Sequence, residues 1–199
     1  MPPVTLAIII ANVAVYLAQQ AIPGLVIPFA LWPIGSAAAS GGQVGFEVWQ
    51  LLTYGFLHGG LLHLAFNMFA VYMFGGALEQ VVGQRRYLVY YLVCVLAAGL
   101  TQLLVTSASG TLYPTVGASG GVFGLLLAYG IYFPRNKVFF LLLPVPIPAR
   151  IFVVIYAVIE LYLGVTGTQE GVAHFAHLGG LAGGALMLAF WRRGRLIRS

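Results

Sequence analysis

One serine of this chain stands apart because of where it lies. Ser119 belongs to the segment Gly117-Ala118-Ser119-Gly120, at the start of an apolar stretch of helix length. Flanking glycines leave room for another group to approach the hydroxyl closely. The remaining serines lie in polar or Gly/Ala-rich connections or at the C-terminus: Ser36, Ser40, Ser107, Ser109 and Ser199. Ser119 is therefore the candidate nucleophile.

Two further apolar stretches carry the other groups that a serine hydrolase needs. His177 lies in one of them, and a neutral histidine can take the serine proton and return it to the leaving group. His63 and Asn67 lie in the other, at i and i+4 of one helix face. Each can donate a hydrogen bond to the oxyanion of a tetrahedral intermediate, as can the backbone N–H near Ser119. Phe123, one turn after Ser119, is placed to stack on the imidazole.

The sequence excludes several other hydrolytic mechanisms. It contains no aspartate, so neither an aspartyl dyad nor a Ser-His-Asp triad can form. The HExxH helix motif of zinc hydrolases is absent, and the four glutamates are not spaced as a carboxylate pair. His174 and His177, at i and i+3, could bind a metal, but no anionic third ligand is evident. We therefore expect serine–histidine chemistry without a metal or another cofactor.

The composition places these groups in a membrane. Of the 199 residues, 61% are hydrophobic and only 7% are charged, whereas soluble domains carry about 25% charged residues. The lone cysteine, Cys94, has no disulfide partner and is expected to be a small apolar side chain. The net charge of +5 lies in short Arg clusters beside apolar runs, which indicates topology rather than a nucleic-acid partner. The expected surroundings are a lipid bilayer.

The elements that position the candidate residues are six expected spans. A span needs about 20 mostly apolar residues, and the sequence predicts an all-α membrane protein, a six-helix bundle forming one domain over residues 1–199. The apolar stretch near Met1 lacks a basic segment before it and is expected to be a retained first span. The expected spans are Thr5–Ala21, Gly60–Leu78, Tyr87–Val105, Thr115–Phe133, Ile151–Thr166 and Val172–Trp191.

Positive charges indicate how these spans are oriented. The positive-inside rule puts both termini in the cytoplasm and the connection 22–59 outside, where its Pro, Gly and aromatic residues suit the outer interface. The connections without Lys or Arg hold Glu47 and Glu170. The basic residues fall between spans two and three, between four and five, and after span six: Arg85, Arg86, Arg135, Lys137, Arg150, Arg192, Arg193, Arg195 and Arg198.

This orientation brings the polar side chains to one depth. Spans two, four and six enter from the outer face, with His63 and Asn67 in the first two turns of span two. Ser119 is expected about one turn into span four, and His177 just over one turn into span six. At 1.5 Å per residue all four lie within roughly the outer third of the bilayer. The sequence predicts the common level but not mutual contact.

Glycines on spans four and six can bring these helices close together. Each span carries two pairs of glycines spaced four residues apart, and such pairs let membrane helices pack closely. Close packing would bring Ser119 and His177 within hydrogen-bonding reach. The pairs are Gly117 with Gly121, Gly120 with Gly124, Gly179 with Gly183 and Gly180 with Gly184.

Other interpretations stay open for the same residues. Small residues such as those around Ser119 commonly serve only helix packing. His58, His63 and Asn67 could line a path for water or ions in a channel or transporter, although neither paired broken helices nor a carboxylate relay is evident. Glu160 is interpreted as an interhelical hydrogen-bonding residue, with gating as the alternative.

Two further side chains are expected to act as anchors at the ends of the spans. Glu79 is interpreted as an anchor at the cytoplasmic end of span two, pairing with Arg85 or Arg86. Trp49 is interpreted as an anchor in the outer interface, where Trp side chains are enriched.

Taken together, the motifs resemble the rhomboid family of intramembrane serine proteases, over about residues 49–184. Their order, spacing and placement on spans two, four and six are specific. The matching segments are Trp49-Gln50-Leu51-Leu52-Thr53, His58-x4-His63-x3-Asn67, Gly75-x3-Glu79, Gly117-Ala118-Ser119-Gly120 and Ala176-His177-Leu178-Gly179-Gly180. Two positions depart from the family pattern: Gln50 stands where an arginine is frequent, and Phe123 where the family can place a tyrosine.

The resemblance implies an endopeptidase that uses a Ser-His dyad without an acid, with Ser119 as nucleophile and His177 as base. It implies His63, Asn67 and the Ser119 amide as the oxyanion site, supported by His58. It also implies transmembrane protein substrates, cut near the outer end of their span, and a compact prokaryotic form in the bacterial plasma membrane. Span five and the loop at about residues 167–171 are the expected moving gate. An inactive relative that only binds membrane segments, and a metal-dependent hydrolase, are the remaining alternatives.

Overall fold

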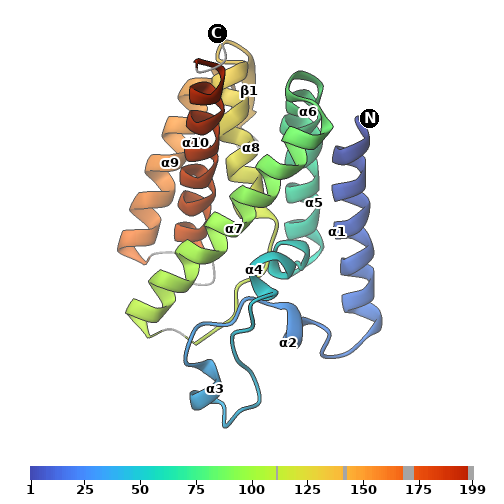
Figure 1. The fold of residues 1–199 in the computed structure, drawn as a ribbon, viewed down its shortest axis with the longest axis vertical. Helices are drawn as coiled ribbons and strands as arrows, with labels where there is room; N and C mark the ends of the chain where they lie inside the picture. The colour runs from blue at the N-terminus through green and yellow to red at the C-terminus, as the bar shows by residue number, and fades with distance from the viewer. Residues whose placement is uncertain (111, 141–142, 168–172, 197–199) are drawn as a thin grey trace.

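The computed structural model describes residues 1–110, 112–140, 143–167 and 173–196, and most of them are helical (Figure 1). The long apolar runs of the sequence form the long helices, and short polar or Gly/Pro-rich stretches connect them. The elements are α1 Pro3–Ala21, α2 Val26–Phe29, α3 Ser36–Ala39, α4 Gln50–Thr53, η1 Tyr54–Phe56, α5 Leu61–Ala70, η2 Val71–Gly75, α6 Gly76–Val82, α7 Gln84–Ser109, α8 Ser119–Tyr132, β1 Lys137–Phe140, β2 Leu143–Pro148, α9 Ala149–Thr166 and α10 His174–Leu196.

Four helical segments are long and apolar enough to cross a membrane. They are α1, α7, α9 and the continuous segment Leu61–Val82, which contains α5, the π-helical turn η2 and α6. These four confirm the first, second, third and fifth expected spans. The apolar helix α8 is shorter, with 14 residues, and at 1.5 Å per residue it is roughly 21 Å long. The 23-residue α10 occupies the place of the sixth expected span.

The helix α8 begins four residues later than expected, at Ser119 instead of Thr115. The preceding backbone is held in a non-helical course by pairing with other segments. The Thr115 N–H donates to the Leu31 carbonyl, and the Leu31 N–H donates to the Thr115 carbonyl. The Gly117 N–H donates to the Tyr54 carbonyl. Gly117 has a φ of +133°, a conformation that ends helical propagation and favours glycine. Ser119 is thereby the first residue of the helix rather than a residue one turn inside it.

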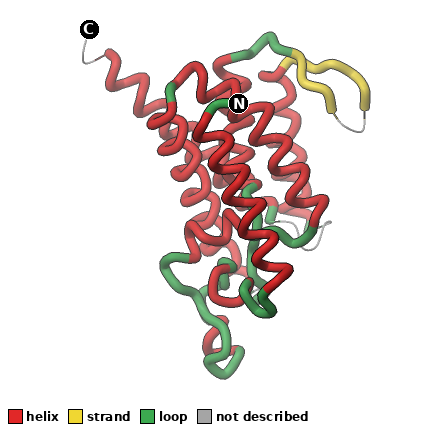
Figure 2. Tube along the Cα trace, turned by 90° about the vertical axis from the view of Figure 1, so that its right-hand side faces the viewer, coloured by secondary structure: helices red, strands yellow, loops and turns green. Residues whose placement is uncertain are grey.

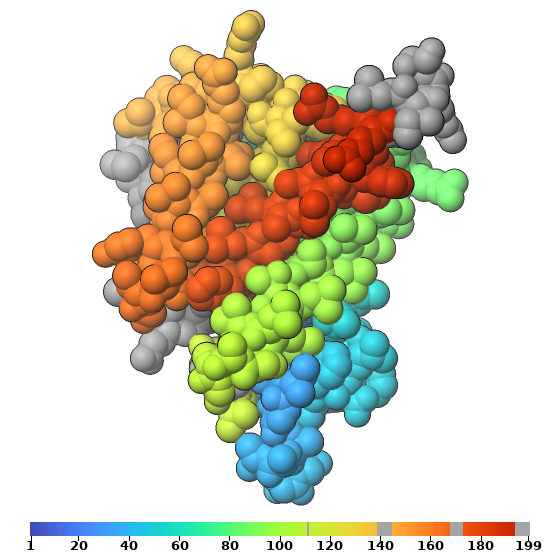
Figure 3. Space-filling view, turned by 60° about the vertical axis from the view of Figure 1, so that its left-hand side comes forward, coloured from blue at the N-terminus to red at the C-terminus, as the bar shows by residue number. Residues whose placement is uncertain are grey.

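The helix α8 lies in the interior, packed on α7, α9, α10 and η2. On one face of the molecule α10 runs between α9 and α7 (Figure 3). Glycines permit these close contacts, as expected: Gly180 lies against the Gly120 backbone and Gly124 lies against Cys94. The Cys94 side chain is fully buried. The contact of Gly180 with Gly120 confirms the predicted close approach of α10 to α8 through their glycines.

Both chain termini lie at the same end of the molecule, together with the α6–α7 junction and the antiparallel hairpin β1–β2 (Figures 1 and 2). The segment that contains α2, α3 and α4 lies at the opposite end. This arrangement fits the expected topology, in which the basic connections share one side. Which end faces the cytoplasm stays a prediction.

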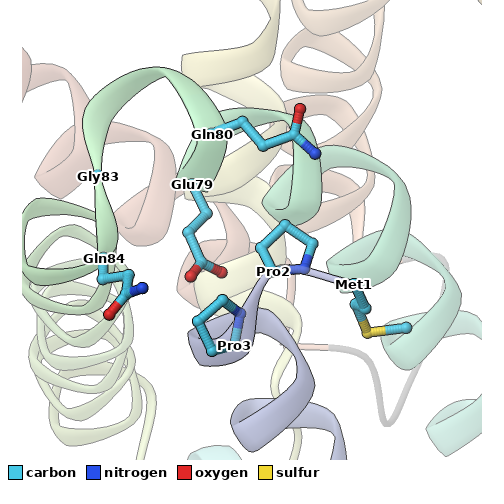
Figure 4. Close-up of a pocket in the computed structure, with 7 residues that line it drawn as sticks. All are labelled: Met1, Pro2, Pro3, Glu79, Gln80, Gly83 and Gln84. Atoms are coloured by element: carbon cyan, nitrogen blue, oxygen red, sulfur yellow. The ribbon is translucent and has the colours of Figure 1, made fainter.

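The structure corrects the predicted partner of Glu79. Its carboxylate accepts hydrogen bonds from the Val4 N–H (3.0 Å), the Thr5 N–H (2.7 Å) and the Thr5 hydroxyl (2.7 Å), so it caps the start of α1. Figure 4 shows the carboxylate turned toward the first residues of that helix. Helix N-termini carry unpaired N–H groups and a partial positive charge, so the buried anion lies here and not against Arg85 or Arg86.

Candidate active site

Ser119 and His177 form a hydrogen-bonded pair. Their Oγ and Nε2 atoms are 2.8 Å apart, although 58 residues separate them in the chain. Ser119 is the first residue of α8, so its N–H has no carbonyl partner within the helix. His177 lies in the first turn of α10. The structure thus adds the mutual contact that the sequence alone left open.

Phe123 holds the imidazole from one side. Its ring stacks on that of His177, with centroids 4.3 Å apart and planes only 8° from parallel. On its other side Phe123 contacts Tyr156 of α9, at 5.8 Å between ring centroids. The predicted stacking is confirmed, and it restricts rotation of the His177 ring.

Glu160 of α9 reaches the far side of the same imidazole. Its Oε2 lies 2.9 Å from His177 Nδ1 and 2.6 Å from His174 Nδ1. All three residues are buried. The interpretation of Glu160 as an interhelical hydrogen-bonding residue is confirmed, but its contact with the candidate base was missed. The only signal in the sequence was a lone carboxylate inside an apolar span.

The same cluster supplies the anionic third ligand that the sequence did not reveal. One ligand atom from each of Glu160, His174 and His177 can lie within 4.8 Å of the others. The donor geometry favours hydrogen bonding over metal binding. Ligands of a tetrahedral zinc at about 2.0–2.1 Å are roughly 3.3 Å apart, whereas 2.6 Å between Glu160 Oε2 and His174 Nδ1 is a short, charge-assisted hydrogen bond.

His63 approaches the serine from α5. Its Nδ1 accepts a hydrogen bond from the Gly59 N–H at 3.4 Å, which assigns the ring proton to Nε2. A methyl group at Gly117 would lie 2.9 Å from His63 Nε2 and 3.7 Å from Ser119 Oγ. Gly117 therefore lies between the two side chains, and only a residue without a side chain fits there.

Asn67 lies one turn below His63 on the same helix face. Its side-chain amide donates to the His63 carbonyl at 2.9 Å, which fixes its orientation and leaves one further N–H on the same nitrogen. Asn67 also lines the cavity that contains Ser119 and His177. His63 and Asn67 of α5 thus border the same cavity as the pair Ser119 and His177.

His58 lies behind His63 rather than at the serine. The two rings meet edge to face at 5.1 Å, and His58 is only 2% exposed. Its backbone N–H and carbonyl are both bonded to the side-chain amide of Gln19 on α1. Burial, with the neighbouring His63 as a second cause, lowers the pKa of the His58 imidazole from 6.5 to about 4. A neutral ring therefore packs against His63 at neutral pH.

A cavity of about 750 Å³ joins these groups. It lies between α5 and α9, with α8 as its floor and residues 113–116 on one side. Ser119, His63 and His177 line it together with aromatic side chains, which include Phe66 and Phe69 of α5 and Phe152 and Tyr156 of α9. A mostly apolar cavity with a few convergent polar groups is typical of a ligand site.

Internal hydrogen bonds hold the segment between α1 and α5 at Gln50, the position that departs from the family pattern. Gln50 is buried, accepts the Trp32 N–H at 3.1 Å and donates to the Gly45 carbonyl at 3.1 Å. Trp49 is half exposed and donates to the Pro28 carbonyl at 2.9 Å. A neutral amide here replaces the arginine contact with internal hydrogen bonds. Of the expected gate loop 167–171, only Gly167 lies within the described residues.

Comparison with known proteins gives consistent matches. The rhomboid domain family matches residues 45–194. The chain is 36% identical over 138 residues to the rhomboid protease GluP of Bacillus subtilis, which covers 69% of this chain and 25% of that protein. It is 31% identical over 191 residues to the rhomboid protease GlpG of Pectobacterium atrosepticum, which covers 95% of this chain and 62% of that protein.

A third relative is similar to this chain to about the same degree. The chain is 32% identical over 153 residues to the rhomboid protease GlpG of Salmonella choleraesuis, which covers 71% of this chain and 51% of that protein. The chain thus spans from a quarter to about three fifths of the length of these relatives. Together with the apolar helices, the matches identify a multi-pass membrane protein.

Proposed function

Because the chain belongs to the rhomboid family, we propose that it is an intramembrane serine endopeptidase that cleaves transmembrane protein substrates. The observation that carries the proposal is the 2.8 Å contact of Ser119 with His177, at the edge of a cavity between helices. A hydroxyl bonded to an imidazole nitrogen is the arrangement that makes a serine nucleophilic. The proposed working unit is one domain, residues 1–199.

The reaction follows from the pair. His177 Nε2 takes the proton as Ser119 Oγ attacks the scissile carbonyl carbon, which gives a tetrahedral intermediate. The protonated His177 then gives this proton to the departing amine, and an ester to Ser119 remains. Water, deprotonated by the same nitrogen, attacks the ester and releases the acid, with the proton returned to Ser119.

The oxyanion of each tetrahedral intermediate needs fixed donors. We assign this role to the N–H of Ser119, at the positive end of the α8 dipole, and to the side chains of His63 and Asn67. The Gly59 contact leaves His63 Nε2 as the donor on the side next to Gly117. One lost donor of this kind costs about 10²–10³ in kcat.

The cavity suits an unwound piece of a membrane span. Its aromatic walls favour apolar side chains, whereas the peptide bond must reach the polar groups around Ser119. A peptide bond in an intact helix is shielded, so Gly or Pro near the cut site helps to expose it. We expect a small residue before the scissile bond, because His63 lies close against Gly117 and narrows the space beside Ser119.

Entry of the substrate requires a gate, and we place it at α9. This helix forms one wall of the cavity with Phe152 and Tyr156, while α5 forms the other wall with Phe66 and Phe69. A thiol crosslink between Phe69→Cys and Phe152→Cys should abolish cleavage of a transmembrane substrate. Reduction should restore it, and each single variant is the control. Unchanged cleavage in the crosslinked protein would show that α9 is not the gate.

The first experiment compares the intact protein with Ser119→Ala and His177→Ala in liposomes, using a purified transmembrane reporter substrate. We expect cleavage by the intact protein and a loss of at least about 10³-fold in both folded variants. Full activity in both variants would refute the serine mechanism. Inhibition by a chelator, with no effect of a fluorophosphonate, would favour a metal hydrolase at the Glu160 cluster.

The rival function is a membrane protein without proteolytic activity. A channel or transporter could use the same polar cavity, and an inactive relative could bind membrane segments. Labelling separates these cases from the proposal. A fluorophosphonate that reacts with Ser119, and not with the His177→Ala variant, indicates an activated nucleophile, which neither rival requires. Absence of labelling together with absence of cleavage would favour the rivals.

A further inference from the structure

Glu160 forms the third part of a hydrogen-bonded chain that begins at the nucleophile. Ser119 Oγ is 2.8 Å from His177 Nε2, and His177 Nδ1 is 2.9 Å from Glu160 Oε2. The three residues come from α8, α10 and α9. The family resemblance implies two of them and no acid, so the carboxylate is a feature of this chain that the expected mechanism does not use.

The contact decides which nitrogen of His177 carries the proton. A carboxylate can only accept, so His177 Nδ1 must donate to Glu160 and Nε2 is left unprotonated toward Ser119. This is the tautomer that can accept the serine proton. The opposite tautomer has no function as a base at this position. Stacking by Phe123 restricts the ring but does not choose between the tautomers.

The carboxylate also faces the charge that appears during the reaction. When His177 takes the serine proton it becomes an imidazolium, 2.9 Å from Glu160 in a buried setting. An opposite charge at this distance attracts the imidazolium, and burial makes that attraction stronger than it would be in water. His174 contacts the same oxygen through Nδ1 at 2.6 Å, while its Nε2 has no hydrogen-bond partner among the described residues. It serves as an internal comparison for a purely structural role.

We propose that Glu160 is a positioning residue for His177, which makes the reacting group of this chain a Ser119–His177–Glu160 triad. The inference rests on the proposed proteolytic function. Because Glu160 belongs to α9, His177 is oriented only while that helix lies against α10. Outward movement of α9 separates the Glu160 carboxylate from His177. The position of this helix therefore also controls whether His177 is oriented to accept the proton of Ser119.

The test compares Glu160→Gln, which replaces the carboxylate by a neutral amide, with His174→Gln, which replaces the second imidazole bonded to the same oxygen. For Glu160→Gln we expect kcat to fall about 10²- to 10⁴-fold with KM little changed. For His174→Gln the fall should stay below about tenfold, the effect of one ordinary hydrogen bond. Glu160→Asp should recover part of kcat. Equal small losses in both Gln variants, or a change in KM alone, would overturn the proposal.

A small probe separates positioning from gating. Fluorophosphonate labelling of Ser119 requires an activated serine but no passage of a helix between α5 and α9. If Glu160 positions His177, labelling of Glu160→Gln slows in proportion to kcat. Labelling at the rate of the intact protein, with slow cleavage of the transmembrane substrate, would assign Glu160 to the gate alone and refute positioning.

A spectroscopic measurement covers the case in which Glu160→Gln does not fold. In the intact protein with ¹⁵N-labelled histidine, His177→Gln identifies the His177 resonances by their loss. We expect the proton on Nδ1 of His177, and a proton on Nε2 would overturn the proposal. If Ser119→Ala and His177→Ala are inactive while Glu160→Gln is fully active, only this inference fails. If those two variants are active, the proposed function fails and the inference with it.

Discussion

Gly117 has little freedom to change, because both its backbone conformation and its neighbours disfavour a side chain. It has a φ of +133°, and a methyl group there would lie 2.7 Å from His63 Cε1. Gly117→Ala should therefore push His63 away from Ser119 and lower kcat about 10²-fold, the effect of one lost oxyanion donor. The strained backbone should also cost about 1–3 kcal/mol of unfolding free energy. Cleavage kinetics and thermal unfolding in detergent check both effects.

A second glycine provides the matched control for this substitution. Gly83 also has a positive φ, +82°, but a methyl group there meets no atom within 4 Å. It lies at the α6–α7 junction, at the end of the molecule away from α4. Gly83→Ala should lower stability and leave kcat unchanged. An equal loss of kcat in both variants would show that backbone strain alone, and not contact with His63, explains the Gly117 result.

At the scale of residues, the sequence predicted the members of the site better than their contacts. Ser119, His63 and Asn67 could be chosen because polar groups inside apolar spans are rare and functional. Glu160 met the same criterion, yet nothing in its spacing linked it to His177, because the two lie on different helices. A contact of this kind depends on the rotation of each helix about its axis, which a one-dimensional pattern does not specify.

At the scale of elements, the first turn of α1 is hydrogen-bonded to a carboxylate of α6. Glu79 of α6 accepts two backbone N–H groups and one hydroxyl there. Glu79→Ala leaves buried donors unpaired, and we expect a loss of about 2–3 kcal/mol in unfolding free energy. The remaining folded protein should keep its kcat. Thermal unfolding in detergent and cleavage per folded molecule measure the two effects.

The adjacent Gln80 gives the comparison for this variant. Its side chain is exposed on the same helix, and both residues border the same surface pocket beside Met1 (Figure 4). Gln80→Ala should change the unfolding temperature little, because it removes no buried hydrogen bond. If Glu79→Ala is as stable as Gln80→Ala, the capping of α1 does not contribute to stability.

The start of α8 shows why element boundaries were harder to predict than elements. The apolar pattern predicted a helix from Thr115, but residues 115–117 take an extended course because Leu31 and Tyr54 bond to their backbone. These partners lie more than sixty residues earlier in the chain. Local propensity cannot include such a contact, yet it makes Ser119 the first helical residue, whose N–H has no acceptor within its own helix.

At the scale of the whole molecule, one property could be predicted without any contact. The basic residues of the chain cluster at two connections and at the C-terminal end, and the structure brings the two termini, the α6–α7 junction and the β1–β2 hairpin to one end (Figures 1 and 2). Charge distribution follows from insertion into the membrane and not from packing. The orientation of the spans can therefore be predicted from the sequence, whereas helix rotations and side-chain contacts cannot.

The distribution of basic residues also predicts which end of the molecule faces the cytoplasm. Lys137 begins β1 and Gly42 follows α3, two elements at opposite ends of the molecule (Figure 1), and both residues are exposed. The single native Cys94 is fully buried, so it should not react with a maleimide. In intact bacterial cells, a membrane-impermeant maleimide should label Gly42→Cys and spare Lys137→Cys. Permeabilised cells should show both labelled. The reverse pattern in intact cells would invert the topology and place Ser119 near the cytoplasmic face, which would in turn move the cleavage site to the inner end of the substrate span.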